Sequence, residues 1–116
     1  MADSDCLFCK IVAGDLSADI VHETDTTVAF RDLDPQAPVH VLVIPKQHQP
    51  TAAELVDADP AVLPQIIAAA RDVAVAEGIA ESGYRLVVNT GPDAHQGVFH
   101  LHVHVLGGRT MGWPPG

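Results

Sequence analysis

Apolar and polar residues alternate along residues 98–106, close to the end of the chain. In a β-strand, a period of two sends successive side chains to opposite faces of the sheet. We therefore expect a strand over residues 98–106 with one face directed into a core. That face would carry Phe99, Leu101, Val103 and Val105, and the other would carry His100, His102 and His104.

Four other segments have the composition of β-strands: residues 20–23, 26–30, 39–44 and 84–89. Each is rich in β-branched or aromatic residues, and turn-forming residues separate most of them. The loop between the last two predicted strands is short, which favours their antiparallel pairing.

Residues 59–78 carry the clearest helical pattern, because apolar side chains recur there at intervals of three and four. Asp59 would cap this helix, Pro60 would occupy its first position, and Gly78 would end it. The predicted apolar stripe comprises Leu63, Ile66, Ile67, Ala70, Val73 and Ala74. A short turn of helix is also compatible with residues 52–56. We therefore expect an α+β fold: an antiparallel sheet of about five strands with one main helix packed on it.

The composition indicates one folded domain over residues 1–116, with 47% hydrophobic and 18% charged residues. No apolar run approaches the ~20 residues of a membrane span. The acidic first five residues, which we expect to be disordered, lack the features of a signal peptide. A cytoplasmic location is therefore the default expectation. The formal net charge of −9 disfavours binding to nucleic acid or to anionic membranes, but a local pocket could still hold an anionic small ligand.

The row of three histidines is the most distinctive chemistry in the chain. On an extended strand its members lie about 6–7 Å apart, so one metal ion could not easily bind all three. Imidazole exchanges protons near neutral pH and can act as a nucleophile. The row therefore indicates a reaction centre with a central imidazole and a helper on each side. A polar face without a role, or a pair of metal ligands, is the alternative interpretation.

This row resembles the His-x-His-x-His motif of the histidine triad (HIT) superfamily. Further segments are similar to its histidine triad nucleotide-binding (HINT) branch, and together they cover nearly the whole chain: residues 7–11, 29–33, 35–38, 40–46, 84–89, 106–109 and 113–116. The resemblance implies a HIT fold and a homodimer whose sheets join across the interface. The tail over residues 107–116 would then pack toward the partner, with Trp113 reaching the partner's site.

The activity implied by the resemblance is hydrolysis of purine nucleoside 5′-phosphoramidates, or of acyl or aminoacyl adenylates, through a nucleotidyl-histidine intermediate. A hydrolase or transferase acting on dinucleoside polyphosphates or adenylyl sulfate is one alternative. A nucleotide-binding regulatory protein with weak turnover is another, and a metallohydrolase that uses the histidine row is a third.

Residue roles also follow from the resemblance. His102 would be the nucleophile, His104 would hold the phosphate oxygens, and His40 and His100 would assist. The expected nucleotide site for an AMP-type or GMP-type substrate comprises Phe8, Leu16, Asp32, Leu33, Leu42, Asn89, His95, Gln96, Gly97, Val98, His102 and His104.

Two positions depart from the HINT pattern. Gly97 stands where a serine is common, so the chain keeps the backbone donor but loses a hydroxyl. One lost hydrogen bond is worth on the order of 1–3 kcal/mol in a transition state, which is about tenfold to a hundredfold in rate. His95 stands where a small residue is usual, as a solvated loop residue or as a compensating proton donor.

Cys6 and Cys9 form a Cys-x-x-Cys pair near the start of the chain. Two buried thiols, a redox pair and a zinc site are all compatible with this spacing. Some members of the superfamily add a histidine after Pro-Lys and the first histidine of the row. Those positions are His48 and His100 here, which would complete a closed Cys₂His₂ site for structural zinc. Catalysis would require no cofactor.

Overall fold

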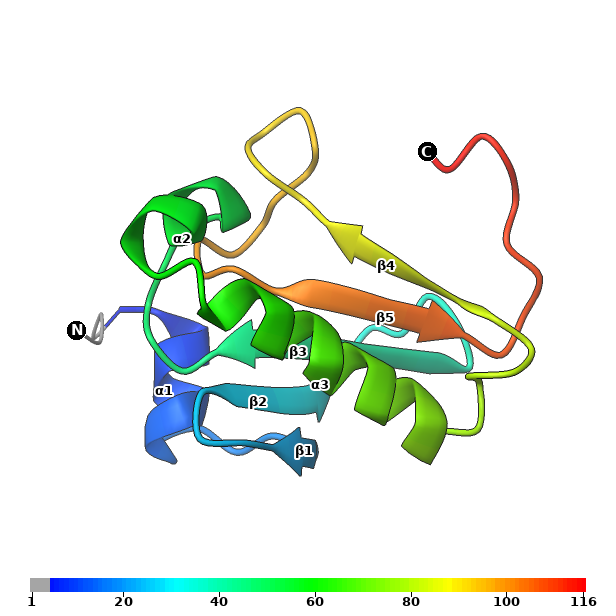
Figure 1. Ribbon diagram of the computed structural model, residues 1–116, viewed down its shortest axis with the longest axis horizontal. Coiled ribbons are helices and arrows are strands. Elements are labelled where there is room, and N and C mark those ends of the chain that lie inside the picture. The colour runs from blue at the N-terminus through cyan, green and yellow to red at the C-terminus, as the bar shows by residue number, and fades with distance from the viewer. Residues whose placement is uncertain (1–4) are drawn as a thin grey trace.

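A computed structural model describes residues 5–116, so most of the N-terminal segment that we expect to be disordered lies outside the described residues. The elements in chain order are α1 (Leu7–Ala13), β1 (Ile20–Glu23), β2 (Thr27–Arg31), β3 (Val39–Pro45), α2 (Ala52–Ala58), α3 (Val62–Ala76), β4 (Tyr84–Val88) and β5 (Val103–Gly107). The strands form one antiparallel sheet in the order β1-β2-β3-β5-β4. Figure 1 shows α3 lying across one face of this sheet. The predicted fold class is therefore confirmed.

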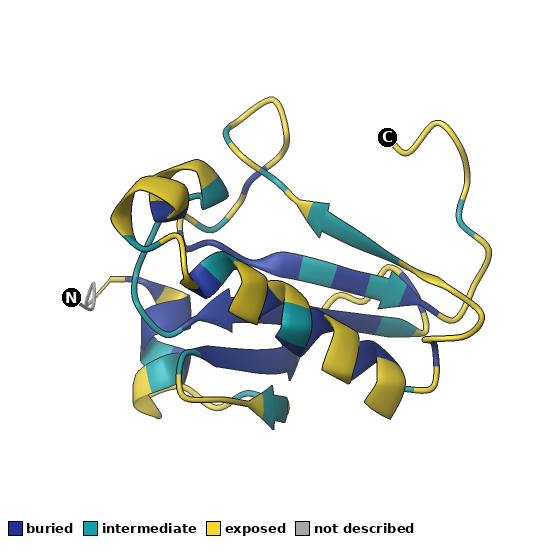
Figure 2. Ribbon diagram, in the orientation of Figure 1, coloured by how far each residue is buried: buried dark blue, intermediate teal, exposed yellow. Residues whose placement is uncertain are grey.

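The sheet separates two apolar clusters because its strands alternate between faces. On one face, α3 packs against residues such as Ala29, Val41, Val43 and Val105. On the other face, α1 packs against Val28, Phe30, Leu42 and Ile44. In β3 and β5, His40 and His104 share the parity of Leu42, so both lie on the α1 face. The functional side chains are thus mounted on a sheet whose centre is buried, as Figure 2 shows.

α3 begins later than the sequence predicts. Asp59 does not cap it, because α2 continues to Ala58 and Asp59 ends that helix, its N–H donating to the Leu55 carbonyl at 2.8 Å. Pro60 lies in the connection, and Ala61 takes the N-cap position without a side-chain bond. Ile67 is also misassigned, since its side chain is 49% exposed. The buried stripe of α3 is instead Val62, Ile66, Ala69, Ala70, Val73 and Ala74.

The histidine strand is shorter than predicted. β5 begins only at Val103, and Phe99 is 61% exposed rather than part of the core. The backbone before Val103 makes other bonds: the Leu101 N–H donates to the Gln49 carbonyl at 2.7 Å, and the Val98 carbonyl accepts from the Gln96 amide at 3.1 Å. These groups are therefore not free for a β-ladder.

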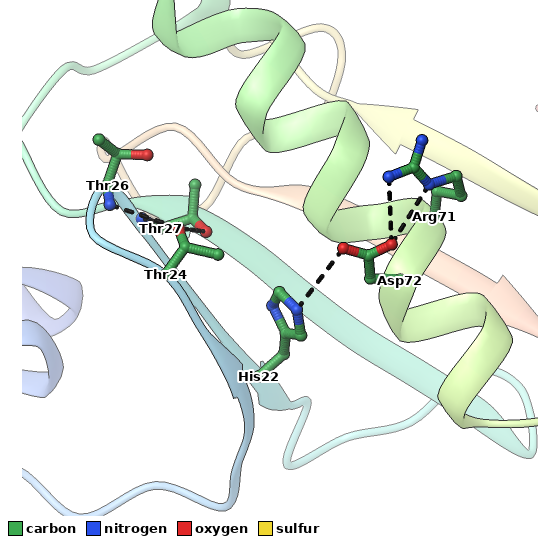
Figure 3. Close-up of polar contacts among 6 residues, drawn as sticks. All are labelled: His22, Thr24, Thr26, Thr27, Arg71 and Asp72. Atoms are coloured by element: carbon green, nitrogen blue, oxygen red, sulfur yellow. Dashed lines mark hydrogen bonds and ion pairs between the residues drawn. The ribbon is translucent and has the colours of Figure 1, made fainter.

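Polar contacts secure the β1 edge of the sheet (Figure 3). The Thr24 hydroxyl accepts from the Thr26 and Thr27 N–H groups at 3.3 and 3.0 Å, which shapes the turn between β1 and β2. Nε2 of His22 lies 3.8 Å from Oδ2 of Asp72 in α3, and this contact links β1 to the helix that covers the sheet. Among the described residues, no helix is both long and apolar enough to span a membrane.

Candidate active site and metal centre

A cavity of about 460 Å³ opens on the α1 face of the sheet. Its lining brings together α1, the segment after it, β2, β3, the loop after β4 and β5. Eleven of the twelve predicted nucleotide-site residues line it: Phe8, Leu16, Asp32, Leu33, Leu42, Asn89, His95, Gly97, Val98, His102 and His104. The fold therefore gathers residues that are more than ninety positions apart in the sequence.

Gln96 is the exception, because it supports the loop rather than lining the cavity. Its Oε1 accepts from the Gly91 N–H at 2.9 Å, and its Nε2 donates to the Pro50 and Val98 carbonyls at 2.7 and 3.1 Å. The loop is further closed by the Gln96 N–H, which donates to the Gly91 carbonyl at 3.1 Å. The side chain of Gln96 thus fixes the position of the loop that carries Gly97 and Val98.

Several cavity residues were not among the sequence predictions: Leu7, Ile11, Ser17, Ala18, Asp19, Phe30 and Arg31. Phe30 could have been found, because strand alternation places it on the same face as Leu42. Ser17, Ala18 and Asp19 lie in the connection before β1, where no periodic pattern predicts which side chains face the cavity.

His102 is buried, with 8% of its surface exposed, and lines the cavity. Its Nδ1 lies 2.8 Å from the His100 carbonyl oxygen. A carbonyl can only accept, so Nδ1 carries the proton and Nε2 is left with a free lone pair. The Phe8 ring packs edge-on against this imidazole, with 5.2 Å between the two ring centroids, and limits its rotation. The backbone therefore holds His102 in the tautomer of a nucleophile.

A chain of hydrogen bonds orders two further imidazoles. The Gln36 N–H donates to His40 Nδ1 at 3.0 Å, so neutral His40 carries its proton on Nε2. That Nε2 lies 2.9 Å from His104 Nδ1, which must accept. His104 consequently carries its own proton on Nε2. One backbone amide thus determines the tautomers of both histidines.

His104 Nε2 is buried and has no hydrogen-bond partner among the described residues. A buried donor without a partner costs free energy, and such groups frequently belong to a binding site. His104 also lines the cavity, so a ligand oxygen that reaches its Nε2–H would supply the partner that this donor lacks.

Burial keeps this pair of imidazoles neutral. It lowers the pKa of His104 to about 4, with smaller contributions from repulsion by His102 and His40 that outweigh the attraction of Asp32. Burial also lowers the pKa of His40, although Asp32 and Asp34 oppose the shift. At neutral pH both rings therefore act as hydrogen-bonding groups rather than as cations.

Asp32 and Leu33 follow β2 at the rim of the cavity. One Asp32 oxygen accepts from the Asp34 N–H at 2.8 Å, and the other lies 3.5 Å from His40 Nε2. The carboxylate is only partly buried, so it can still accept hydrogen bonds from a ligand that carries hydroxyl groups. Leu33 is fully exposed and adds an apolar edge.

The two departures from the HINT pattern have distinct geometries. His95 has a φ of 64°, in the left-handed region that glycine adopts without strain. Gly97 does not have a positive φ, and a Cβ built on it would meet no atom within 4 Å. A side chain at position 97 is therefore sterically permitted, and its absence leaves open space beside the histidines.

The predicted metal ligands come together in a second cluster, next to the cavity. Cys6, Cys9, His48 and His100 each offer one ligand atom, all within 4.8 Å of one another. The Nδ1 atoms of His48 and His100 are 3.3 Å apart. The Cys9 sulfur lies 3.3 Å from Nδ1 of His48 and 3.5 Å from Nδ1 of His100, and the Cys6 sulfur lies 3.4 Å from Nδ1 of His100. Tetrahedral zinc with ordinary bond lengths requires separations of about 3.3 Å between nitrogens and about 3.5 Å between nitrogen and sulfur. The donor set and its spacing therefore fit zinc.

His100 is also oriented for such a role. Its Nε2 lies 2.8 Å from the Pro45 carbonyl and must donate to it, which leaves the lone pair on Nδ1 toward the cysteines. Cys6 serves additionally as the N-cap of α1, where its sulfur accepts from the Cys9 N–H at 3.3 Å. The cluster thus joins α1, the loop after β3 and the segment before β5.

The tail after β5 lies beside β4, where the Arg85 guanidinium donates to the Gly112 carbonyl at 2.8 Å. Trp113 is 83% exposed in the single chain.

Comparison with known proteins identifies the family. The HIT domain family matches residues 13–111. An uncharacterized HIT-like protein of Synechococcus elongatus is 49% identical over 97% of this chain and 97% of its own length. A 14 kDa zinc-binding protein of Zea mays is 43% identical over 98% of this chain and 90% of its own. This chain therefore belongs to the HIT domain family.

Solved structures agree with this assignment. The structure of a HIT family hydrolase from Legionella pneumophila has a TM-score of 0.92 and 49% identity, covering 97% of this chain and all of that one. A histidine triad nucleotide-binding protein from Candida albicans has a TM-score of 0.82 and 32% identity, covering 95% of this chain and 83% of that one.

Proposed function

We propose that this protein is a homodimeric hydrolase that cleaves the P–N bond of purine nucleoside 5′-phosphoramidates, and the corresponding P–O bond of acyl or aminoacyl adenylates. The observation that carries the proposal is the state of His102: its Nδ1 proton is held by the His100 carbonyl, and its Nε2 lone pair is free beside a cavity of nucleotide size. Solved relatives described as a HIT family hydrolase and as a histidine triad nucleotide-binding protein support the same class of activity.

The nucleoside occupies the apolar part of the cavity, where Phe8, Leu16 and Leu42 face the base. Asp32 accepts from the ribose hydroxyls. A phosphate oxygen takes the unpartnered His104 Nε2–H, and the N–H groups of Gly97 and Val98 supply further donors. These donors are in position before the reaction, which is the requirement for stabilising charge in the transition state.

His102 Nε2 attacks phosphorus, and an N–P bond forms as the P–N bond to the leaving amine breaks. The amine departs with a proton taken from water, because Gly97 offers no hydroxyl on this side. A second water then attacks phosphorus as the bond to His102 breaks, its proton neutralises the hydroxide that the first water became, and the nucleoside monophosphate leaves. His102 returns to the neutral tautomer held by the His100 carbonyl. Two easier steps thereby replace one difficult displacement.

A single-turnover assay with the lysine or tryptamine phosphoramidate of AMP tests this proposal. Wild-type protein should release AMP in the presence of EDTA, whereas His102→Ala should release none. His22→Ala is the matched control, because it removes a histidine from β1, outside the cavity. If the wild type binds AMP but releases none from either adduct, the proposal is wrong and a binding or regulatory role takes its place.

We also propose that the Cys/His cluster binds zinc as a structural ion, with Cys6, Cys9, His48 and His100 as its ligands. Support comes from the tetrahedral spacing of the four donors and from a relative described as a zinc-binding protein. All four protein ligands are needed to close the site, so no position remains for a reacting water. Zinc would hold α1 against the sheet, and catalysis would proceed on the other imidazoles.

The homodimer belongs to the same proposal. β4 lies at one edge of the sheet and, among the described strands, pairs with β5 alone, so no described strand covers its other side. Tyr84 and Val88 expose apolar surface along that strand. Joining two copies there would continue the sheet and bring the tail with Trp113 next to the partner's site.

A further inference from the structure

His100 belongs to both candidate sites. Its ring Nδ1 lies 3.4 Å from the Cys6 sulfur and 3.5 Å from the Cys9 sulfur, inside the Cys/His cluster. Its backbone carbonyl accepts the Nδ1 proton of His102 at 2.8 Å, beside the nucleotide cavity. One residue thus carries a donor for the proposed zinc on its side chain and, on its backbone, the acceptor that sets the tautomer of the proposed nucleophile.

The position of His100 depends on its side chain, because it lies outside the sheet ladder. β5 begins at Val103, and its pairings with β3 and β4 end there as well. The ring of His100 is fully buried and is held on one side by the Pro45 carbonyl, which accepts from Nε2 at 2.8 Å. A zinc ion on Nδ1 would hold the ring from the opposite side, with a bond of about 2.0–2.1 Å. Zinc would thereby fix the carbonyl that orients His102.

Phe8 makes a second connection between the two sites. It lies in α1 between the N-cap residue Cys6 and Cys9, and it lines the nucleotide cavity. Its ring centroid is 6.0 Å from that of His100 and 5.2 Å from that of His102, and both rings are met edge-on. α1 has only seven residues, so it is too short to be stable alone. An ion bound to both cysteines would hold the turn of α1 that presents Phe8 to the cavity.

These contacts determine the direction of the effect that one ligand has on the other. The conformation that brings the four donors of the cluster within 4.8 Å of one another also places Phe8 and the His100 carbonyl against His102. A ligand stabilises the conformation that it binds best, so zinc and a nucleotide would favour the same conformation. Such coupling is reciprocal: each ligand must tighten the binding of the other by the same factor.

We propose that the Cys/His cluster positions the nucleotide site, so that zinc binding and nucleotide binding strengthen each other through His100 and Phe8. This inference rests on the proposed function and on the proposed zinc site, and it specifies how the nucleotide site is regulated. His100 and Phe8 are positioning residues in this respect, because both act through His102. Without zinc, His102 keeps its own chemistry and the protein still releases AMP, but it binds the nucleotide less tightly.

Calorimetric titration with AMP tests the coupling on the full chain, at a temperature below the unfolding of both forms. One sample carries one zinc per chain and no excess ion, and the other has been freed of zinc with EDTA and dialysed. The Kd for AMP should be about tenfold higher without zinc. Competition with a chromophoric chelator should show that saturating AMP tightens zinc binding by the same factor, about tenfold.

The Nδ1 proton of His102 reports directly on the connection through His100. In ¹⁵N-labelled protein, NMR should show that this proton exchanges faster with water after zinc is removed, because its acceptor is the His100 carbonyl. An exchange rate that zinc does not alter would overturn the connection.

Two variants separate the coupling from a general loss of stability. Phe8→Leu keeps an apolar side chain and all four donors of the cluster, but removes the ring that contacts both histidines. The ratio of its AMP dissociation constants without and with zinc should fall below about threefold. Leu16→Ala is the matched control, because Leu16 lines the cavity and is not part of the cluster. It should weaken AMP binding in both forms and keep the wild-type ratio. The same ratio in Phe8→Leu as in the wild type would overturn the proposal.

The remaining outcomes distinguish the coupling from the proposals beneath it. If zinc is removed and the Kd for AMP stays the same, the coupling is refuted while the phosphoramidase function stands. If the wild type binds no zinc, the zinc site fails and the coupling fails with it. If the wild type shows the expected ratio but cleaves neither the lysine nor the tryptamine adduct of AMP, the coupling holds and the proposed reaction is wrong.

Discussion

At the scale of single residues, the site depends on where protons are held. His102 and His104 line one cavity, and His40 lies behind them in contact with His104. Backbone groups determine the tautomer of each of these three imidazoles: the His100 carbonyl for His102, and the Gln36 N–H for His40 and, through it, His104. A backbone group does not titrate over the physiological range, so these tautomers persist where a side-chain partner could lose its proton. His102 as the proposed nucleophile and His104 as the proposed phosphate donor therefore both hold the required tautomer before a ligand arrives.

Burial of neutral His104 makes stability depend on pH. Its pKa falls from 6.5 to about 4 on folding, so between these values the unfolded chain binds more protons than the folded one. The folded state is therefore stable above pH 6.5 and loses stability as the pH falls from 6.5 toward 4. The loss attributable to His104 should be on the order of 3 kcal/mol, with a further loss in the same direction from His40.

Urea unfolding at pH 7.0, 5.5 and 4.5 measures this loss. His104→Gln should show a clearly smaller decrease in the free energy of unfolding between pH 7.0 and 4.5 than the wild type. His95→Gln, which changes an exposed histidine in the loop, is the control and should keep the wild-type slope. A His104→Gln slope equal to that of the wild type would contradict the buried neutral imidazole.

Gly97 gives a second prediction at this scale. The open space at its Cβ and the absence of a positive φ allow Gly97→Ser to fold without strain. The new hydroxyl can donate to the leaving nitrogen, so turnover of unsubstituted adenosine 5′-phosphoramidate should rise about tenfold to a hundredfold. Stopped-flow measurement of AMP release tests this, with Gly116→Ser as the control at another unobstructed glycine. An unchanged or lower rate would mean that the missing hydroxyl does not limit this enzyme.

At the scale of elements, the local pattern predicts the interior of each element better than its ends. Alternation in β3 and β5 places His40, Leu42 and His104 on one face, as the structure has them. It fails before Val103, because the Gln49 carbonyl accepts from the Leu101 N–H and the Gln96 side chain donates to the Val98 carbonyl. Gln49 is distant in sequence from Leu101, and the bond to Val98 is made by a side chain, so no periodicity reveals either partner. The start of α3 is missed for a similar reason, since α2 continues into the predicted cap.

The Cys/His cluster joins several elements, and removal of the zinc ion that we propose it binds should loosen α1. α1 is a seven-residue helix, too short to be stable alone, and its inner side depends on the smaller of the two apolar clusters. An ion that binds only the folded state stabilises it by about 4 kcal/mol at a thousandfold excess over its dissociation constant. EDTA should therefore lower Tm by roughly 10 °C or more.

Calorimetry with and without EDTA, together with elemental analysis, tests this effect. Cys9→Ser should abolish stoichiometric zinc and remove the response of Tm to EDTA. Ser82→Ala, which alters an exposed polar residue in the turn before β4, should retain both. Cys9→Ser protein that keeps one zinc per chain would exclude Cys9 as a ligand.

At the scale of the whole molecule, the proposed homodimer requires an edge of the sheet that a second copy can meet. β1 and β4 are the two edges, and each begins with a large exposed apolar residue, Ile20 and Tyr84. β1 is four residues long with an irregular register to β2, and His22 ties it to α3, so it offers a poor template for pairing. β4 pairs with β5 along all five of its residues and bears the exposed tail on its flank. We therefore expect the dimer to form through β4.

Sedimentation velocity with matched substitutions tests this arrangement. The wild type should sediment as a species of twice the chain mass. Tyr84→Lys should shift toward the single chain, because the lysine lies on the edge strand through which the two copies pair. Ile20→Lys should remain dimeric, because it lies on the other edge. Trp113→Ala should stay dimeric but lose activity, since its ring would act in the partner's site. Dissociation by Ile20→Lys alone would assign the interface to β1. A wild type that sediments as a single chain would require one copy to supply the complete site, with Trp113 left outside it.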